Sequence, residues 1–415
     1  MRRLHTDRGP SPFLLLALTT TPLYAHGQDL EADDDPPTEW SFELGGSIAF
    51  ELRSFVDGPK FEGQFDTFQS SFVFEPELRW ETEDRDDQIM FIPFYRYDAQ
   101  DDERTHFDVR EAYRRHVDGD WELLVGVNRV FWGVTESRHL VNVINQIDAV
   151  EDIDEEDFLG QPMVQLGYES ENGRFDLFLM TGFRPRTFAG RDGRLRAPLP
   201  VDDDAEQYES SLEEWRPEFA LRYSHFFGDI DLGLHIFHGT GREPELMPDA
   251  TGLRLVPRYS VINQFGVDFQ YTQDALLWKF EGIVREGQGD TFAAAVAGFE
   301  YTLYQIGDSD ADLGLLVEGL YDGRDDDVFP TIYDEDLFLG ARLALNDVED
   351  TSLLIGLVTD FEEGPETMRL EFERRLSDNW KFVLEAQVFF QNDPKSAAVA
   401  FEQDSFIGLR FARFF

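Results

Sequence analysis

The polar residues best suited to contact a solute are concentrated in one segment, residues 131–148. It mixes Leu, Val and Ile with charged and amide side chains, and the candidates are Glu136, Arg138, His139, Asn142, Asn145, Gln146 and Asp148. Such a mixture suits a segment that packs its apolar side chains against the wall of a larger structure and presents its polar side chains to water. The chemistry on offer is the binding and steering of small polar solutes. A plain external loop is the alternative interpretation.

An acidic run follows this segment directly, and it consists of Glu151, Asp152, Asp154, Glu155, Glu156 and Asp157. Carboxylate oxygens at this density can hold Ca²⁺ or Mg²⁺. The spacing is not that of an EF-hand, however, and no glycine hinge flanks the run. We therefore expect a solvated loop rather than a structural ion site.

The sequence lacks the motifs of a catalytic centre. It has no Gly-x-Ser-x-Gly elbow, no zinc-binding His-Glu pair, no phosphate loop and no cysteine. His225, His235 and His238 fall on adjacent strands of one predicted hairpin, where polar wall residues are a better explanation than metal ligands. The sequence predicts neither an enzyme nor a cofactor or metal.

The composition combines strong acidity with many aromatic residues. The net charge is -48, yet the 415 residues include 39 Phe, 13 Tyr and 7 Trp, which argues against disorder. Three explanations of the negative charge are solvated loops, adaptation to a salty medium and a preference for cations. The same charge argues against nucleic acid as a partner. No apolar run approaches the roughly 18 residues that a membrane-spanning helix needs.

Apolar and polar residues instead alternate with a period of two. In residues 40–52, the even positions carry Trp, Phe, Leu and Ile apart from one glycine, and the odd positions carry Ser, Glu, Gly and Ala. The pattern recurs at 68–80, 261–271, 337–345 and 380–390. Successive side chains of a strand point to opposite faces, so a wall between hydrocarbon and water produces this pattern. The sequence predicts an all-β, transmembrane, antiparallel up-and-down β-barrel of about 16–18 strands.

The polar face of this pattern carries charges of both signs. The predicted lumen-lining residues are Arg79, Lys279, Glu281, Glu318, Arg342, Arg369, Glu371, Lys381, Glu385 and Arg410. Opposed rows of charge across a pore would tune which solutes pass. Charges that pair and stiffen the wall are the alternative, and both interpretations can hold together.

Short and long connections alternate along the chain. Tight turns such as 118–120 and 171–173 separate long connections, of which 133–161 is the third. Because short turns of bacterial barrels are periplasmic, we predict that both termini are periplasmic. The sequence does not settle which face of two predicted strands points outward. Residues 88–98 are apolar on both faces, and residues 107–117 place charged and apolar side chains on the same face. A bulge or an inward-folded loop would explain them.

The first residues have the order of a secretory signal. Basic Arg2, Arg3 and Arg8 precede an apolar stretch, and small residues lie near Gly27. This predicts a signal peptide at 1–27, a short periplasmic extension at 28–39 that is too short for a plug domain, and the barrel at 40–415. The predicted location is the outer membrane of a Gram-negative bacterium.

Parts of the chain show three resemblances to known outer-membrane proteins. Ile407, Leu409, Phe411 and Phe415 resemble the C-terminal signature that the barrel-assembly machinery reads, which implies that machinery as a partner, although Arg413 stands where an apolar residue is usual. By its position, 133–161 resembles the inward-folded third loop of general porins. Residues 108–113 and 132–148 resemble a poorly characterised family of porin-like exported proteins, known as a domain of unknown function, over about residues 105–170. Membership implies outer-membrane placement and handling of hydrophobic compounds.

Together these features predict a channel through which small solutes diffuse, narrowed by the third long loop and preferring cations. One alternative is a transporter for a specific or hydrophobic substrate whose lumen is plugged by 133–161 and 184–214. Another is a structural or adhesive barrel that acts through its extracellular loops. The solute, the pore size and the oligomeric state, monomer or homotrimer, stay open.

Overall fold

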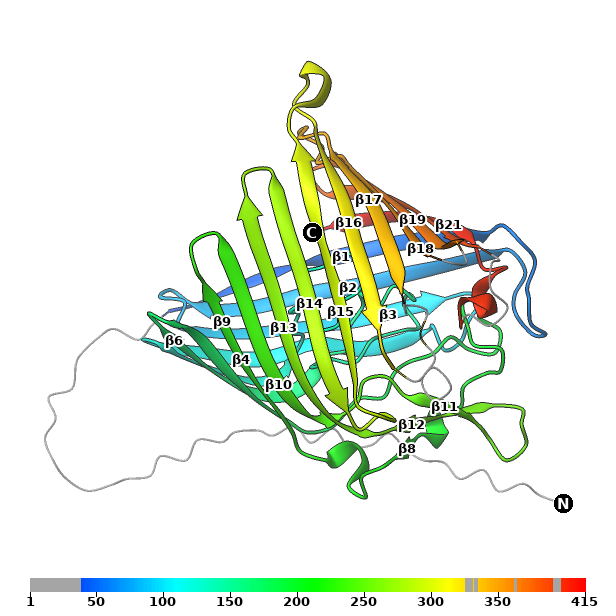
Figure 1. The fold of residues 1–415 in the computed structure, drawn as a ribbon. Coiled ribbons are helices and arrows are strands. Elements are labelled where there is room, and N and C mark those ends of the chain that lie inside the picture. The colour runs from blue at the N-terminus through cyan, green and yellow to red at the C-terminus, as the bar shows by residue number, and fades with distance from the viewer. Residues whose placement is uncertain (1–38, 325–330, 332–334, 362–363, 391–396) are drawn as a thin grey trace, which may run out of the picture. The chain divides into compact units, whose positions relative to one another are not determined.

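In the computed structural model, 18 strands of the described chain close into one antiparallel barrel (Figure 1). The described residues are 39–324, 331, 335–361, 364–390 and 397–415. The predicted signal peptide at 1–27 lies outside them, as does the predicted extension apart from its last residue. Those two assignments therefore stay predictions.

The barrel strands follow one another around the wall in chain order. They are β1 (Trp40–Phe55), β2 (Phe68–Thr82), β3 (Asp87–Asp98), β4 (His106–Asp118), β5 (Trp121–Asn128), β6 (Gln161–Ser170), β7 (Gly173–Met180), β9 (Glu218–Phe226), β10 (Ile230–Thr240), β13 (Val261–Gln273), β14 (Leu276–Glu286), β15 (Phe292–Leu303), β16 (Asp312–Asp322), β17 (Asp336–Ala344), β18 (Ser352–Asp360), β19 (Gly364–Ser377), β20 (Trp380–Phe389) and β21 (Phe406–Phe414).

The last strand closes the sheet on the first. β21 pairs with β1 from Phe406 opposite Phe55 to Phe414 opposite Ser47, and Figure 1 shows red β21 beside blue β1. A closed antiparallel sheet leaves no unpaired edge. The predicted up-and-down barrel of about 16–18 strands is therefore confirmed.

The remaining regular elements are short and lie in the connections. A separate three-stranded sheet consists of β8 (Gln207–Tyr208), β11 (Glu245–Pro248) and β12 (Leu255–Tyr259). The 3-10 turns are η1 (Asp203–Ala205), η2 (Glu213–Trp215), η3 (Ile306–Asp308) and η4 (Ala397–Phe401). Among the described residues, no helix has the length and apolar character needed to cross a membrane.

The outer wall is apolar, as the alternation predicts. On β1, Phe42, Leu44 and Phe50 are about half exposed, whereas Ala49 on the other face is buried. Exposed large apolar side chains recur at alternate positions of other strands, such as Leu177 on β7. A wall of this kind is stable where hydrocarbon surrounds it, because no other part of the described chain covers these side chains.

A β-bulge explains the side-chain pattern of residues 88–98 and 107–117, for which the sequence did not settle which face points outward. Ile92 pairs with Glu111 and Pro93 with Val109, so Arg110 is the extra residue on β4. An extra residue shifts the alternation of a strand by one, so the side chains after the bulge point to the face opposite to the one that simple alternation predicts. Phe107 before it is exposed, whereas Glu111 after it lies opposite inward-facing Ile92.

Short turns gather at one end of the barrel and most long connections at the other. The turns at 119–120, 171–172 and 227–229 lie at the end where β1 begins and β21 finishes. Two connections at this end, 304–311 and 345–351, are longer than the other turns there. The alternation of short and long connections is therefore real but not strict.

A charge placed on the outer wall should destabilise the barrel strongly. Leu177→Arg, at the middle of β7, is expected to lower the free energy of unfolding by about 2–4 kcal/mol, because an arginine at the bilayer midplane loses its water. The measurement is a denaturant titration in lipid vesicles. The matched control is Gln165→Arg on β6, whose side chain donates to inward-facing Asp176 (2.9 Å). Equal losses for both variants would contradict the assigned facing.

Candidate functional site inside the barrel

The connection between β5 and β6, residues 129–160, contacts strands all around the barrel, and we call it the inner loop. Its ion pairs are Asp152–Arg53 on β1 (2.5 Å), Asp148–Arg110 on β4 (2.6 Å), Arg138–Asp322 on β16 (2.9 Å), Glu136–Arg342 on β17 (2.6 Å) and Asp154–Arg369 on β19 (2.7 Å). One segment can reach strands on opposite sides of a closed wall only from within. The inner loop therefore lies in the barrel interior.

An apolar half of the inner loop packs against the inner face of the wall. Its side chains are Trp132, Leu140, Val141, Val143 and Ile144, all less than 8% exposed. They share one cluster with inward-facing residues of β5 to β18, among them Leu124, Phe178, Phe237, Ile283, Leu316 and Phe338. Each such buried side chain contributes about 1.5–3 kcal/mol. Protein therefore fills this half of the interior.

Two buried carboxylates of the wall hold the tip of the inner loop. Glu281 is 0% exposed and accepts hydrogen bonds from the amides of Val134 (2.6 Å), Thr135 (3.0 Å) and Val141 (3.2 Å). The Thr135 hydroxyl also donates to it (2.8 Å). Glu318 accepts from the amides of residues 136 and 137 in the same way. Because an ionised acceptor strengthens such bonds, these two carboxylates fix the loop backbone.

His139 lies beside one of these carboxylates. Its Nδ1 is 3.7 Å from Glu281 Oε1. Burial alone would lower the pKa of His139, but the Glu281 carboxylate outweighs it, so the pKa of the imidazole is raised. The ring therefore carries positive charge over a wider pH range than a free histidine.

Several predicted contact residues of the inner loop are buried instead. Asn145, Gln146 and Asp148 are at most 2% exposed. The Asn145 amide donates to the carbonyls of Asn128 (2.8 Å) and Leu159 (2.9 Å). Asn142 Oδ1 likewise accepts from backbone amides of the loop. The expectation that these side chains face water is not met, because an irregular loop inside a barrel must satisfy its own backbone groups.

The other half of the interior is charged and contains a cavity. Its volume is about 310 Å³, and it lies between the inner loop and the strands on either side of the β1–β21 seam. The charged lining residues are Arg53, Arg96, Arg104, Arg129, Arg369, Arg410, Glu51, Glu75, Glu151, Asp152, Asp154, Asp157 and Glu385. Both signs are therefore represented, as the alternation predicts for a polar inner face.

The acidic run does not form a solvated external loop. Asp152 and Asp154 pair with wall arginines, and Glu151 pairs with Arg96. Glu156 and Asp157 are exposed inside the barrel and make no ion pair with any residue that the structure describes. The run therefore bridges the inner loop to the wall and leaves two carboxylates open to water.

The predicted lumen residues are mostly paired with one another or with the inner loop. Lys279 lies near Glu136 (3.8 Å) and Glu300 (3.7 Å), and Arg342 contacts the same two carboxylates. The remaining pairs are Arg369–Glu371 (2.7 Å), Arg369–Glu385 (3.2 Å), Arg410–Glu51 (2.7 Å), Arg79–Glu81 (2.6 Å) and Lys381–Glu373 (2.8 Å). Pairing within the wall is thus extensive.

Sequence reasoning missed the arginines that clamp the inner loop. Arg104 donates to the carbonyls of Val150 (3.0 Å) and Glu151 (3.0 Å), and Arg96 donates to Glu151 (2.7 Å). Arg96 and Arg110 belong to the two strands whose facing was open. Arg53 extends the polar face of β1, so the alternation could have identified it.

A histidine and two carboxylates converge beside these arginines. His106 Nε2 lies 3.6 Å from Asp148 Oδ2 and 3.5 Å from Glu151 Oε1. Both oxygens already accept from guanidinium groups. Burial by itself would raise the pKa of Asp148, but His106 and Arg110 hold it well below its usual value. The group is thus an ion-pair network in which a metal cation would meet neighbouring positive charge.

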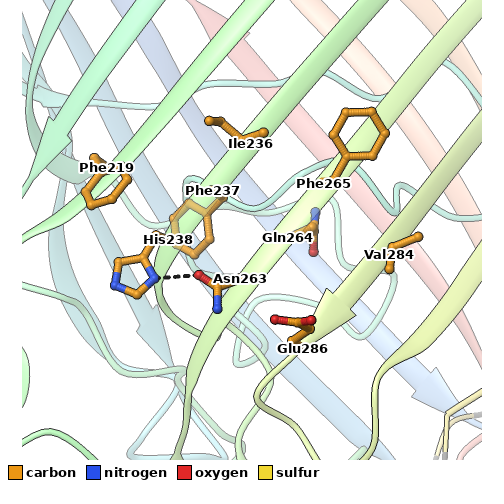
Figure 2. Close-up of a pocket in the computed structure, with 9 residues that line it drawn as sticks. All are labelled: Phe219, Ile236, Phe237, His238, Asn263, Gln264, Phe265, Val284 and Glu286. Carbon is orange, nitrogen blue, oxygen red and sulfur yellow. Dashed lines mark hydrogen bonds between the residues drawn. The ribbon is translucent and has the colours of Figure 1, made fainter.

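One groove of the structure lies on the outer wall rather than inside (Figure 2). Its volume is about 520 Å³. Outward-facing Phe219, Ile236 and Phe265 line it, and His238 Nδ1 lies 2.7 Å from Asn263 Oδ1 at one end. Because these side chains belong to the apolar face of the alternation, the groove opens on the outside of the barrel. It has no part in a pathway through the barrel.

The connection between β7 and β9, residues 181–217, is anchored to connections on the opposite side of the barrel, at the end that has most of the long connections. We call it the mouth loop. Arg194 Nε donates to Asp404 Oδ1 (2.5 Å), and its Nη1 donates to the carbonyl of Asp66 (2.6 Å). Those partners belong to the β20–β21 and β1–β2 connections. Arg194 and Asp404 are both at most 3% exposed. The mouth loop therefore crosses the opening of the barrel.

No family model matches the chain, and no similar curated protein was found. Among solved structures, the chain is similar to OmpT, an outer membrane protein of Vibrio cholerae, at 10% identity over 91% of this chain and 99% of that one, with a TM-score of 0.46. It is also similar to the outer membrane channel DcaP of Acinetobacter baumannii, at 10% identity over 91% and 97% of the two chains (TM-score 0.45). A mutant of the Rh. blastica porin gives 13% identity over 90% and 100% (TM-score 0.44).

Proposed function

We propose that this protein is an outer-membrane channel that lets small solutes diffuse across the membrane and prefers cations. The proposal includes an outer membrane location, with the short turns and both termini in the periplasm. It assigns no catalytic role to any residue. Insertion would use the barrel-assembly machinery, and monomer and homotrimer are both compatible with it.

One observation carries the proposal: the barrel is apolar outside, while one half of its interior is charged and contains a cavity beside the inner loop. The charged cavity lies at the β1–β21 seam, opposite the apolar half of the inner loop. Water and small polar solutes are stable beside such charges, whereas hydrocarbon is stable against the outer wall. In this proposal the inner loop is the constriction.

The preference for cations is supported by the charge of the protein and of this loop. The chain carries a net charge of -48, and exposed Glu156 and Asp157 add unpaired negative charge inside the barrel. Fixed charges of one sign raise the local concentration of counter-ions. Cations should therefore enter more readily than anions.

Ion selectivity in a planar bilayer tests the proposal. With a KCl gradient, purified protein is expected to give stepwise currents. Their reversal potential should be shifted from zero toward the equilibrium potential of K⁺. The double variant Glu156→Gln/Asp157→Asn should lower the cation-to-anion permeability ratio about two- to threefold, the size of effect expected for exposed charges. The matched control is Glu171→Gln, in an exposed turn at the other end of β6. Absence of any conductance from folded protein would overturn the channel proposal.

A transporter for a specific substrate is a second candidate, favoured by the extent to which the interior is closed. The inner loop fills one half, its ion pairs bridge the other half, and the mouth loop crosses the opening. For such a transporter, ion currents should be small or absent, while flux of one solute saturates. Conductance that rises linearly with salt concentration would favour the open channel.

A further inference from the structure

We propose that the inner loop carries a binding site for small organic cations, at a cavity lined by Phe131, Thr135, Glu136, His139 and Glu156. The proposal rests on the proposed channel function and names the class of solute that the constriction would retain. The cavity has a volume of about 280 Å³. This lies just below the range of drug-sized pockets, so the ligand would be small.

Phe131 is the first observation that points to a ligand. It is 54% exposed, and it is the only exposed large apolar side chain in the fully described segment 129–160. The neighbouring Trp132 is 7% exposed in the apolar cluster. An aromatic ring that faces water inside a barrel gains nothing from packing on the wall. It is therefore available to a solute that passes through.

The ring of Phe131 is held in place by two neighbours. Its centroid lies 4.8 Å from that of His139 in an edge-to-face arrangement and 6.2 Å from that of Phe158. Gly133 permits the close approach of the first pair, because a Cβ there would lie 2.4 Å from His139 Nδ1 and 3.0 Å from Phe131 Cζ. The exposed ring is thus preorganised, which lowers the entropy lost on binding.

The second observation is the sign of the free charge beside this ring. Glu136 is engaged by Arg342 (2.6 Å) and Lys279 (3.8 Å). Glu156 is exposed and has no ion-pair partner among the described residues, so its carboxylate is available. His139 is the one cationic group that lines the described cavity, and its imidazole lies against the Glu281 carboxylate (3.7 Å). The charge left uncompensated beside Phe131 is therefore negative.

An exposed ring next to a free carboxylate defines the chemical class of the ligand. An ammonium group is attracted both to the face of an aromatic ring and to a carboxylate, and the apolar part of the ligand covers the ring. An anion of the same shape would meet Glu156 and Glu136, and a neutral analogue would gain only the apolar contact. The site should therefore retain aryl- or alkylammonium ions.

Channel block by benzylammonium tests this inference. Added to the bath in a planar bilayer experiment, benzylammonium is expected to reduce the potassium current in a saturable manner. Benzyl alcohol and benzoate, which match its ring but not its charge, should block at least several times more weakly. Phe131→Leu keeps the apolar volume but removes the ring, and it should raise the half-blocking concentration about 2- to 30-fold, the range of cation–π interactions. Glu156→Gln should raise it as well.

The controls separate this inference from the channel function itself. Phe227→Leu and Glu171→Gln make the same exchanges in exposed turns, and they should leave block unchanged. Heat-modifiable migration on a gel verifies that each variant is folded. Equal block by all three probes, or block unaffected in both inner-loop variants, would overturn the site while the channel stands. If folded protein carries no current, calorimetric titration with benzylammonium tests the site alone, and absence of binding overturns it.

Discussion

Replacing Glu281 by alanine is expected to release the inner loop while the barrel itself persists. The carboxylate is fully buried and accepts three backbone amides and one hydroxyl. Without it, those donors are left in the interior with no acceptor, and each buried orphan costs about 1–3 kcal/mol. After partial relaxation we expect the free energy of unfolding to fall by about 3–5 kcal/mol.

Solute permeability provides the second measurement for this variant. A displaced inner loop would widen the pathway, so liposomes that contain Glu281→Ala should swell in larger sugars than wild-type liposomes do. Glu281→Gln keeps one acceptor oxygen and should lie between the two. The matched control is Glu286→Ala, at an exposed position on the outer face of the same strand. If both alanine variants resemble the wild type, the carboxylate does not hold the loop.

The barrel itself was predictable because the alternation of side chains is a local rule. Residues 40–52 show their two faces without reference to any other strand, and each further strand repeats the same pattern. The number of strands follows from counting such segments. The facing of β3 and β4 could not be found in this way, because the bulge at Arg110 shifts the alternation. Apolar Phe94 also faces inward, where Arg110 lies 4.2 Å from its ring.

The position of the inner loop was predictable, but the roles of its residues were not. Glu281 and Lys381 both stand on the polar face of a strand, so sequence alone treats them alike. The structure buries Glu281 under the loop and leaves Lys381 about one-third exposed beside Glu373. Which wall residue meets the loop depends on how residues 129–160 fold. That fold depends on contacts between residues far apart in sequence, such as Asp152 and Arg53.

The same limit explains the acidic run. A dense group of carboxylates looks solvated when its neighbours in sequence are polar, and nothing local indicates an arginine. Arg369 reaches Asp154 across more than half of the chain. Burial of an ion pair is costly unless its geometry and further hydrogen bonds compensate. Here the bridge forms because the closed wall brings both groups into one narrow space.

Replacing Arg194 by methionine should open the mouth of the barrel. Its guanidinium donates to Asp404 (2.5 Å) and to carbonyls of three residues in two other connections, Asp57, Asp66 and Gln403. Removing it leaves the buried Asp404 carboxylate without its cation, which costs about 3–5 kcal/mol. We expect backbone amides near residue 194 to exchange with deuterium at least about 100-fold faster, because local opening governs that rate. In the proposed channel, the ionic current of this variant should also show fewer closing events.

A second substitution distinguishes loss of the anchor from loss of a buried charge pair. In Arg194→Met/Asp404→Leu no unpaired charge remains, so much of the protection should return even though no ion pair does. The control is Arg254→Ala, whose ion pair with Asp202 of the mouth loop (2.7 Å) is exposed and should contribute at most about 1 kcal/mol. If the double variant stays as open as Arg194→Met, the arginine acts through its bonds to the carbonyls. If neither variant opens the mouth, the mouth loop is held by its other contacts, such as the Phe183–Tyr259 ring pair (4.9 Å).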